Sequence, residues 1–411
     1  MHLKKKPIAP SKDFDYYSPE TIFFNSFELF ARHWNKLISD DPAVSWTKYM
    51  KNKYGTFERA LFISCGNGWV ERACFKDGLI AHAAGFDILP ELLETAEREA
   101  KKIAMPSVYS VEDGNAIDLP RSSYNLIVNN GACHHIAFLD RLLREVHGAL
   151  APDGLYLILD YTGSHRNQYS WTAWEKMIFA RSALPEKYQT ALRYPHMLTM
   201  LSLDPTEAIH SELQLELMER YFDFEQHVAL GGGLVHQLLF GASELLAEQH
   251  SDEGRAILEK LLKADADLLE ISPESNLFTF AICRPKAAAN MPTQTQLDTW
   301  TKEEVAREAF ASDNDGRYYP PTALELIYQE HALETIKLSH QLSAMTSILP
   351  SRKQDQIKKE LYPTHSKTRI FWSEMMRKLS ERWSRNFGPV VKVDRMMKEV
   401  IQNEETKEPF A

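Results

Sequence analysis

Between residues 57 and 161 the chain alternates short apolar runs with helix-length segments whose apolar positions recur every three to four residues. Short apolar runs bounded by turn residues indicate buried strands, and the longer period indicates helices with one buried face. Such alternation is typical of a doubly wound α/β fold with a parallel sheet. The apolar runs predict strands at 61–63, in a run ending at 87, and at 108–111, 124–128, 155–159, 226–230 and 277–283.

The same periodicity predicts helices at 90–104 and 140–150, and further helices on either side of the alternation. Residues 11–55 carry aromatic side chains at helical spacing and predict a pair of helices. These helices either pack on the sheet domain or form a lid that excludes water from a ligand. Residues 169–225 are predicted to be mostly helical, with a helix beginning near Asp204, because Pro205 follows it.

The first predicted strand runs into a turn of small residues, Ser64-Cys65-Gly66-Asn67-Gly68. Glycine has no side chain, so the backbone of such a turn can adopt positive φ and lie against a ligand. Asp87 ends the second predicted strand, at the edge of a parallel sheet where nucleosides bind and where an acid holds the ribose hydroxyls. This spacing predicts a nucleoside-containing ligand.

Two classes of cofactor fit such a turn, and Glu71 distinguishes them. The dinucleotide motif has a third glycine where this chain has Glu71, in the first turn of the next helix. A carboxylate there would repel a pyrophosphate, because the helix N-terminus serves anions only when no acid occupies it. S-adenosylmethionine carries a sulfonium and no phosphate, so the methyl donor is favoured over NAD.

With these features the sequence resembles the class I S-adenosylmethionine-dependent methyltransferases, over about residues 28–285. The resemblance is strongest to bacterial members with an Asp/Glu-Tyr-x-Gly-x-x-Arg-x-Gln motif, which this chain matches from Asp160 to Gln168. It implies a Rossmann-like sheet of seven strands whose last strand is an antiparallel insertion at the sheet edge. Two positions differ, since Phe62 and Ser64 stand where members commonly have an acid and a first glycine. The missing acid removes one polar partner of the cofactor's amino-acid end.

The resemblance also implies the site residues. Asp113 would accept the exocyclic amine of adenine, and the loop after the fifth strand would border the acceptor. The residues expected to bind the cofactor are Ser64, Gly66, Gly68, Asp87, Ile88, Asp113, Gly114 and Asn129, and those expected at the acceptor are His135, Tyr161 and Arg166.

The adjacent His134 and His135 are the best candidates for proton transfer, because imidazole titrates near neutral pH. His135 would take the proton of an attacking hydroxyl or amine. Alternatively, one ring caps a helix or packs against the cofactor. Arg166 and Gln168 have a similar alternative, in which they only fix their loop to a neighbouring helix. His236, which follows three glycines, is interpreted as a core or pocket-wall residue.

Net charge, cysteine content and apolar segments exclude several kinds of binding partner and location. The formal net charge of −10 argues against a nucleic-acid partner held by phosphate contacts. The four cysteines show neither metal-ligand spacing nor a disulfide pattern, so we predict no metal site and a reducing compartment. No segment has the roughly 18 apolar residues of a membrane span. We therefore expect a cytoplasmic protein.

We divide the chain into a helical N-terminal cap (1–55), a methyltransferase domain (56–285), a linker (286–295) and a helical C-terminal extension (296–411). The extension includes a basic amphipathic helix around Phe371 and Trp383, which would bind a membrane surface or an acidic partner, or bury its aromatic face against the main domain or in a homodimer.

The function predicted from the sequence is methyl transfer from S-adenosylmethionine to an oxygen or nitrogen of a small molecule, such as a sugar or a biosynthetic intermediate. Two alternatives stay open. One is a protein or RNA methyltransferase that docks its substrate on the C-terminal helices, and the other is a cofactor-binding scaffold without catalysis.

Overall fold

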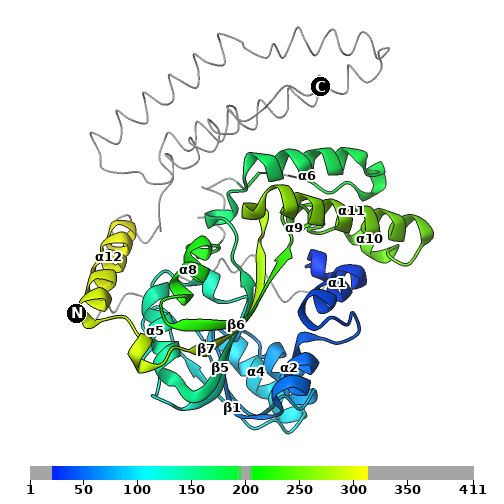
Figure 1. The fold of residues 1–411 in the computed structure, drawn as a ribbon. Helices are drawn as coiled ribbons and strands as arrows, with labels where there is room; N and C mark the ends of the chain where they lie inside the picture. Colours follow the sequence, from blue (N-terminus) through cyan, green and yellow to red (C-terminus); the bar gives the residue numbers. More distant parts are fainter. Residues whose placement is uncertain (1–20, 193, 196–203, 205, 313–411) are drawn as a thin grey trace, which may run out of the picture. The chain divides into compact units, whose positions relative to one another are not determined.

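The structure is a computed structural model and describes residues 21–192, 194, 195, 204 and 206–312 (Figure 1). The predicted basic helix and the predicted dimer contacts beyond residue 312 lie outside these residues.

The centre of the molecule is one seven-stranded sheet, which confirms the predicted α/β fold class. Its strand order is β3-β2-β1-β4-β5-β7-β6, and β7 is antiparallel to both of its neighbours. The antiparallel insertion expected for the last strand is therefore present, but its predicted place at the edge is wrong, because β7 lies between β5 and β6 and β6 is the edge strand. The strands are β1 (Phe57–Phe62), β2 (Ile80–Asp87), β3 (Ser107–Val111), β4 (Tyr124–Asn130), β5 (Leu150–Tyr161), β6 (Phe222–Gly231) and β7 (Phe278–Pro285).

The strand order reverses between β1 and β4, and this reversal positions the site. Helices α3 (Trp69–Lys76) and α4 (Pro90–Lys102) connect strands that progress from β1 toward β3, whereas α5 (Leu139–Ala149) connects β4 to β5 in the opposite direction. Because such crossovers are right-handed, α3 and α4 cover one face and α5 the other. The loops after β1 and β4 therefore diverge and leave a crevice at the carboxyl edge of the sheet.

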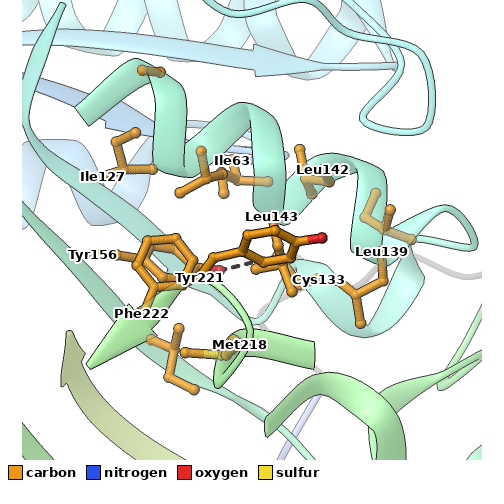
Figure 2. Close-up of a cluster of buried hydrophobic side chains, with 14 of the residues drawn as sticks. Ile63, Ile127, Cys133, Leu139, Leu142, Leu143, Tyr156, Met218, Tyr221 and Phe222 are labelled. Atoms are coloured by element: carbon orange, nitrogen blue, oxygen red, sulfur yellow. Dashed lines mark hydrogen bonds between the residues drawn. The ribbon is translucent and has the colours of Figure 1, made fainter. Parts of the chain in front are cut away.

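A large core cluster lies between the sheet and α5. Leu142 and Leu143 of α5 pack with Tyr156 of β5 and with Tyr221 and Phe222 at the start of β6 (Figure 2). All five are at most 1% exposed. Burial of so much apolar surface holds the reversal point rigidly beneath the site.

The N-terminal helices α1 (Glu28–Ser39) and α2 (Trp46–Tyr54) pack on the sheet domain, as one of the two interpretations predicted. The indole of Trp34 donates to the carbonyl of Leu230 in β6 at 3.0 Å, and Phe24 packs against Phe278 of β7. These contacts join the N-terminal helices to the side of the sheet formed by β6 and β7 (Figure 1). The role of the cap as a lid stays a prediction.

The region between β5 and β7 contains described helices both within the stretch 169–225, which was predicted to be mostly helical, and beyond it. Its helices are α6 (Trp171–Ala183), α8 (Gln214–Met218), α9 (Val235–Leu238), α10 (Ser243–Ala247) and α11 (Asp252–Ile271). The helix predicted to begin near Asp204 is wrong, because Thr206–Ala208 form a turn. The Asp204 carboxylate accepts bonds from the backbone and hydroxyl of Thr206, at 2.9 and 2.6 Å. Such side-chain capping competes with helix formation.

The three glycines after β6 form a tightly packed bend. The Asp265 carboxylate of α11 accepts bonds from the backbone N–H groups of Gly232, Leu234 and Val235 at 2.7–3.2 Å. A Cβ atom on Gly231 would lie 2.5 Å from that carboxylate. A Cβ atom on Gly233 would lie 2.3 Å from the backbone oxygen of Ser275, so the glycines allow the bend to approach both α11 and the chain before β7 closely.

Beyond β7 the chain stays against the domain and forms α12 (Gln294–Ser312). The Glu304 carboxylate, 2% exposed, accepts bonds from the backbone N–H groups of Asp140 and Arg141, at 2.7 and 3.2 Å. It thus caps the N-terminus of α5 from outside that helix. Burial and the nearby Asp140 raise the pKa of Glu304 to about 7. Across the described residues, no helix combines the length and apolarity needed to cross a membrane.

Replacing Glu304 with Ala should lower the free energy of unfolding by about 1–2 kcal/mol, because two helix N–H groups lose their acceptor. Urea unfolding followed by circular dichroism measures the change. Glu303→Ala is the matched control, since Glu303 is exposed on the same helix turn. Equal stabilities of the two variants would contradict the capping role.

Candidate active site

The predicted glycine turn lies at the reversal point of the sheet, between β1 and α3. Ser64, Gly66 and Gly68 all have positive φ, of 42°, 56° and 73°. A Cβ atom on Gly68 would lie 2.8 Å from that of Ala96 in α4, so only glycine fits there. Ser64 adopts the left-handed conformation that glycine would adopt more easily, which explains why a glycine is common at this position in the family it resembles.

Asp87 joins the end of β2 to this turn. Its carboxylate accepts bonds from the backbone N–H of Gly66 at 2.9 Å and of Leu89 at 3.0 Å. Burial raises the pKa of Asp87, and its backbone N–H bonds act in the opposite direction. Two segments separated by about twenty residues therefore meet as the sequence predicted. Ile88, the next residue, is half-buried beside them.

The loop after β3 is fixed to the loop after β4. One oxygen of Asp113 accepts two bonds of 2.9 Å from Asn115, whose side-chain oxygen in turn accepts from the backbone N–H of Ala137 at 2.9 Å. Gly114 is buried, and a Cβ atom there would lie 2.7 Å from Ile136. These contacts hold the segment expected to meet adenine against the segment that carries the two histidines.

Glu71 begins α3 as predicted, but its carboxyl group lies inside the protein. The side chain is 0% exposed, and among the described residues neither of its oxygens has a hydrogen-bond partner. Desolvation raises the pKa of Glu71 to about 8. The group is therefore largely protonated at neutral pH. The charge repulsion of a pyrophosphate that the sequence predicted for Glu71 does not apply to this neutral, buried group.

His134 is paired with the motif acid at the end of β5. Its Nδ1 lies 2.6 Å from Oδ1 of Asp160, whose other oxygen accepts from the side-chain amide of Asn129 at 2.8 Å. Burial favours neutral histidine, but the Asp160 carboxylate outweighs it and raises the pKa of His134 to about 9. Asn129 also accepts from the backbone N–H of Cys133 at 2.9 Å, so it orders the histidine loop.

His135 faces residues that the sequence did not single out. Its Nδ1 lies 3.0 Å from the hydroxyl of Thr206, and its Nε2 lies 3.7 Å from Oε2 of Glu207. Desolvation, together with the positive charge of His134, lowers the pKa of His135. The charge of protonated His135 also acts to lower the pKa of Asp87, against the larger effect of burial. The turn that begins at Asp204 thus supplies the far side of the site.

Tyr161 and Arg166 lie beneath the site. Tyr161 is 3% exposed and donates its hydroxyl proton to the carbonyl of Ser164 at 3.1 Å. Arg166 is 0% exposed, and its guanidinium donates to the backbone carbonyl of Glu207 at 3.0 Å. Arg166 therefore fixes its loop to the turn that carries Glu207, whereas the interpretation from the sequence named a neighbouring helix. Their predicted contact with an acceptor stays a prediction.

His236 lies among aromatic rings rather than facing the site. Its ring packs near Phe24, Tyr161 and Phe278, and desolvation lowers its pKa to about 4. A neutral histidine in an aromatic cluster agrees with its interpretation as a core or pocket-wall residue.

The sequence model of a family described as "Methyltransferase domain" matches residues 61–158, from β1 through most of β5. The chain is 26% identical over 165 residues to demethylmenaquinone methyltransferase of Lactobacillus johnsonii, a match that covers 38% of this chain and 67% of that protein. It is 24% identical over 154 residues to human mitochondrial arginine-hydroxylase NDUFAF5, covering 34% of this chain and 42% of that protein.

Among solved structures, an S-adenosylmethionine-dependent methyltransferase from Mesorhizobium loti is 19% identical and has a TM-score of 0.36, with 58% of this chain and 95% of that chain covered. The match to the human hydroxylase spans less than half of that protein's length.

The chain contains a methyltransferase domain. In sheet order and family match, this domain is of the class I type that uses S-adenosylmethionine.

The raised pKa of Glu71 predicts a pH dependence of stability. The folded state favours the protonated form, so stability is greatest below the unfolded pKa of 4.5 and declines as the pH rises through about 8. In Glu71→Gln this decline should disappear, a difference on the order of 3 kcal/mol between pH 4.5 and 8. Urea unfolding at a series of pH values measures it.

The control is Glu94→Gln, which changes an exposed glutamate of α4 and should keep the wild-type pH profile. If Glu71→Gln also keeps that profile, Glu71 is ionised in the folded protein.

Proposed function

We propose that this protein transfers the methyl group of S-adenosylmethionine to an oxygen or nitrogen nucleophile of a small molecule. The observation that supports it most directly is the bond between the Gly66 backbone and the Asp87 carboxylate. It brings together the turn and the acid that a nucleoside sulfonium requires at the carboxyl edge of the sheet.

In this proposal the cofactor lies across the loops after β1, β2 and β3. The glycine turn would bind its amino-acid end, Asp87 its ribose hydroxyls, and the Asp113 loop its adenine. Contacts would come from the backbone and side chains of Ser64, Gly66, Gly68, Asp87, Ile88, Asp113 and Gly114. Asn129 would act indirectly, because its side chain is already bonded to the histidine loop and to β5.

Methyl transfer is an in-line displacement, in which the nucleophile bonds to the methyl carbon as the carbon–sulfur bond breaks and the sulfonium becomes a thioether. The protein has to align the two groups and let the nucleophile lose its proton. We assign the acceptor to the side of His135 that faces Glu207, because the His135 side chain is 26% exposed and lies near the glycine turn. Tyr161 and Arg166 would position this loop.

The four cysteines are free and buried, which agrees with the reducing compartment expected from the sequence. We accordingly propose a cytoplasmic enzyme.

Macromolecular acceptors and a scaffold without catalysis are the alternatives, and a labelling experiment separates them. The full chain is incubated with methyl-tritiated S-adenosylmethionine and a cell extract split by ultrafiltration into small molecules and macromolecules. Label in the small-molecule fraction is the expected result. Label in protein or RNA would favour the macromolecular alternative, and cofactor binding without transfer to either fraction would favour the scaffold.

Replacing Asp87 with Ala should weaken S-adenosylmethionine binding by roughly 1–3 kcal/mol, because polar partners in the crevice lose their acceptor. Isothermal titration calorimetry measures the affinity. Asp118→Ala, which removes a carboxylate whose side chain is 88% exposed, should bind like the wild type. Unchanged affinity in Asp87→Ala would remove the ribose assignment.

Replacing His135 with Ala should lower turnover roughly a hundredfold while leaving cofactor affinity near the wild-type value, because the acceptor side alone is changed. Steady-state rates with the labelled acceptor fraction provide the test. His82→Ala, at a side chain that is 55% exposed on β2, is the control. A His135→Ala rate equal to that control would make His135 a structural residue.

A further inference from the structure

Three potential metal-ligating atoms converge on the acceptor side of the site. Nε2 of His134 lies 3.8 Å from Oε2 of Glu207, and Nε2 of His135 lies 3.7 Å from the same oxygen. The ligand atoms of all three residues lie within 4.8 Å of one another. Neither of the two nitrogen–oxygen distances is a hydrogen bond, which would be near 3 Å. The atoms thus surround a small space rather than bond across it.

The hydrogen bonds around His135 determine which nitrogen faces this space as an acceptor. The hydroxyl of Thr206 donates its single proton to Asp204 at 2.6 Å. The same oxygen must therefore accept from Nδ1–H of His135, 3.0 Å away. In the neutral imidazole this leaves a lone pair on Nε2, directed toward Glu207. A lone pair facing a carboxylate oxygen is repulsive unless a cation or a proton donor lies between them.

His134 is oriented in the same way by a second carboxylate. Its Nδ1 lies 2.6 Å from Asp160, whose other oxygen accepts from Asn129 at 2.8 Å and Gln214 at 3.1 Å. Asp160 is 1% exposed and buried among these donors. A histidine whose Nδ1 is held by a carboxylate while Nε2 points into a site is the usual arrangement of metal-binding histidines.

The charge of the surroundings also favours a cation. Asp160, Asp204 and Glu207 place three carboxylates around the two histidines, and the positive charges nearby are His134, paired with Asp160, and the Arg166 guanidinium on the backbone of Glu207. Buried carboxylates are costly unless a positive charge meets them. The side chains of His134, His135 and Glu207 are 11%, 26% and 20% exposed, so this cluster is open to solvent on one side.

We propose that His134, His135 and Glu207 bind a divalent first-row transition-metal ion, which displaces the Nε2 proton of His134 to solvent, and leave at least one coordination position open. Two imidazoles and one carboxylate suit Zn²⁺ or Fe²⁺, and three protein ligands with an open position are typical of catalytic rather than structural sites. Bonds of about 2.0–2.2 Å would draw the ligand atoms a few tenths of an ångström closer than they now lie.

This inference rests on the proposed function for its role in catalysis. An acceptor hydroxyl or amine bound at the open position would lose its proton to water more readily, because the ion stabilises the deprotonated form. Nε2 of His135 would then hold the ion, and the ion would activate the nucleophile.

The test measures metal binding directly, without methyl transfer. The full chain is stripped with a chelator, dialysed, and titrated with Zn²⁺ by calorimetry and with Co²⁺ by visible absorption. We expect one ion per chain and the intense visible bands of Co²⁺ with few ligands. His135→Ala and Glu207→Gln should lower the affinity at least about a hundredfold, and Thr206→Val, which removes the hydroxyl that orients His135, about tenfold.

A second group among the described residues, His165, His210 and Glu212, could also hold a metal ion and provides the matched control. Glu212→Gln should leave the affinity unchanged. Thermal unfolding of each metal-free variant and its S-adenosylmethionine affinity show that the variants are folded. The proposal is overturned if the wild type binds no ion, or if Glu212→Gln abolishes binding that His135→Ala and Glu207→Gln retain. Metal binding without methyl transfer would instead overturn only the proposed function.

Discussion

The site depends on one hydrogen bond between distant parts of the chain, from the Gly66 backbone to the Asp87 carboxylate. The glycine turn leaves β1 with three residues at positive φ, and a turn of this kind needs a partner to hold one shape. Asp87 supplies it from the neighbouring strand β2, whose register with β1 fixes the end of one strand beside the end of the other. The register of the sheet therefore positions the glycine turn beside Asp87.

Local patterns predicted this half of the molecule well. Strands, crossover helices and the glycine turn can be predicted from short stretches of sequence, because each depends on neighbouring residues and on burial. The two departures from the family pattern are also explained locally. Phe62 is 2% exposed and packs in the core, whereas Ser64 occupies a left-handed conformation. The carboxyl group of Glu71 was expected to face a ligand at the start of α3, but it is buried inside the protein. The position of a residue in a helix does not show which way its side chain points.

The acceptor side could not be predicted in the same way. His135 and Glu207 are 72 positions apart in the sequence, and only tertiary packing of the turn after Asp204 brings them together. The Asp-Pro-Thr-Glu stretch carries the signals of a helix start, but Asp204 uses its carboxylate to bond Thr206 within a turn. The proposed metal ligands likewise show no spacing pattern in the sequence, because only the two adjacent histidines share a segment. Asp160, an acid directly after the predicted strand 155–159, was the one feature of the sequence that pointed to a polar partner for the histidines.

The capping of α5 by Glu304 has a consequence for how the chain can be divided. The helix begins four residues after His135, so its first turn supports the segment that carries both histidines. Two of the N–H groups in that turn are bonded by a residue nineteen positions beyond the end of β7. A fragment cut at the last strand would keep the whole sheet and still lose an anchor of its histidine loop. The boundary of the working enzyme therefore lies beyond the boundary of its sheet.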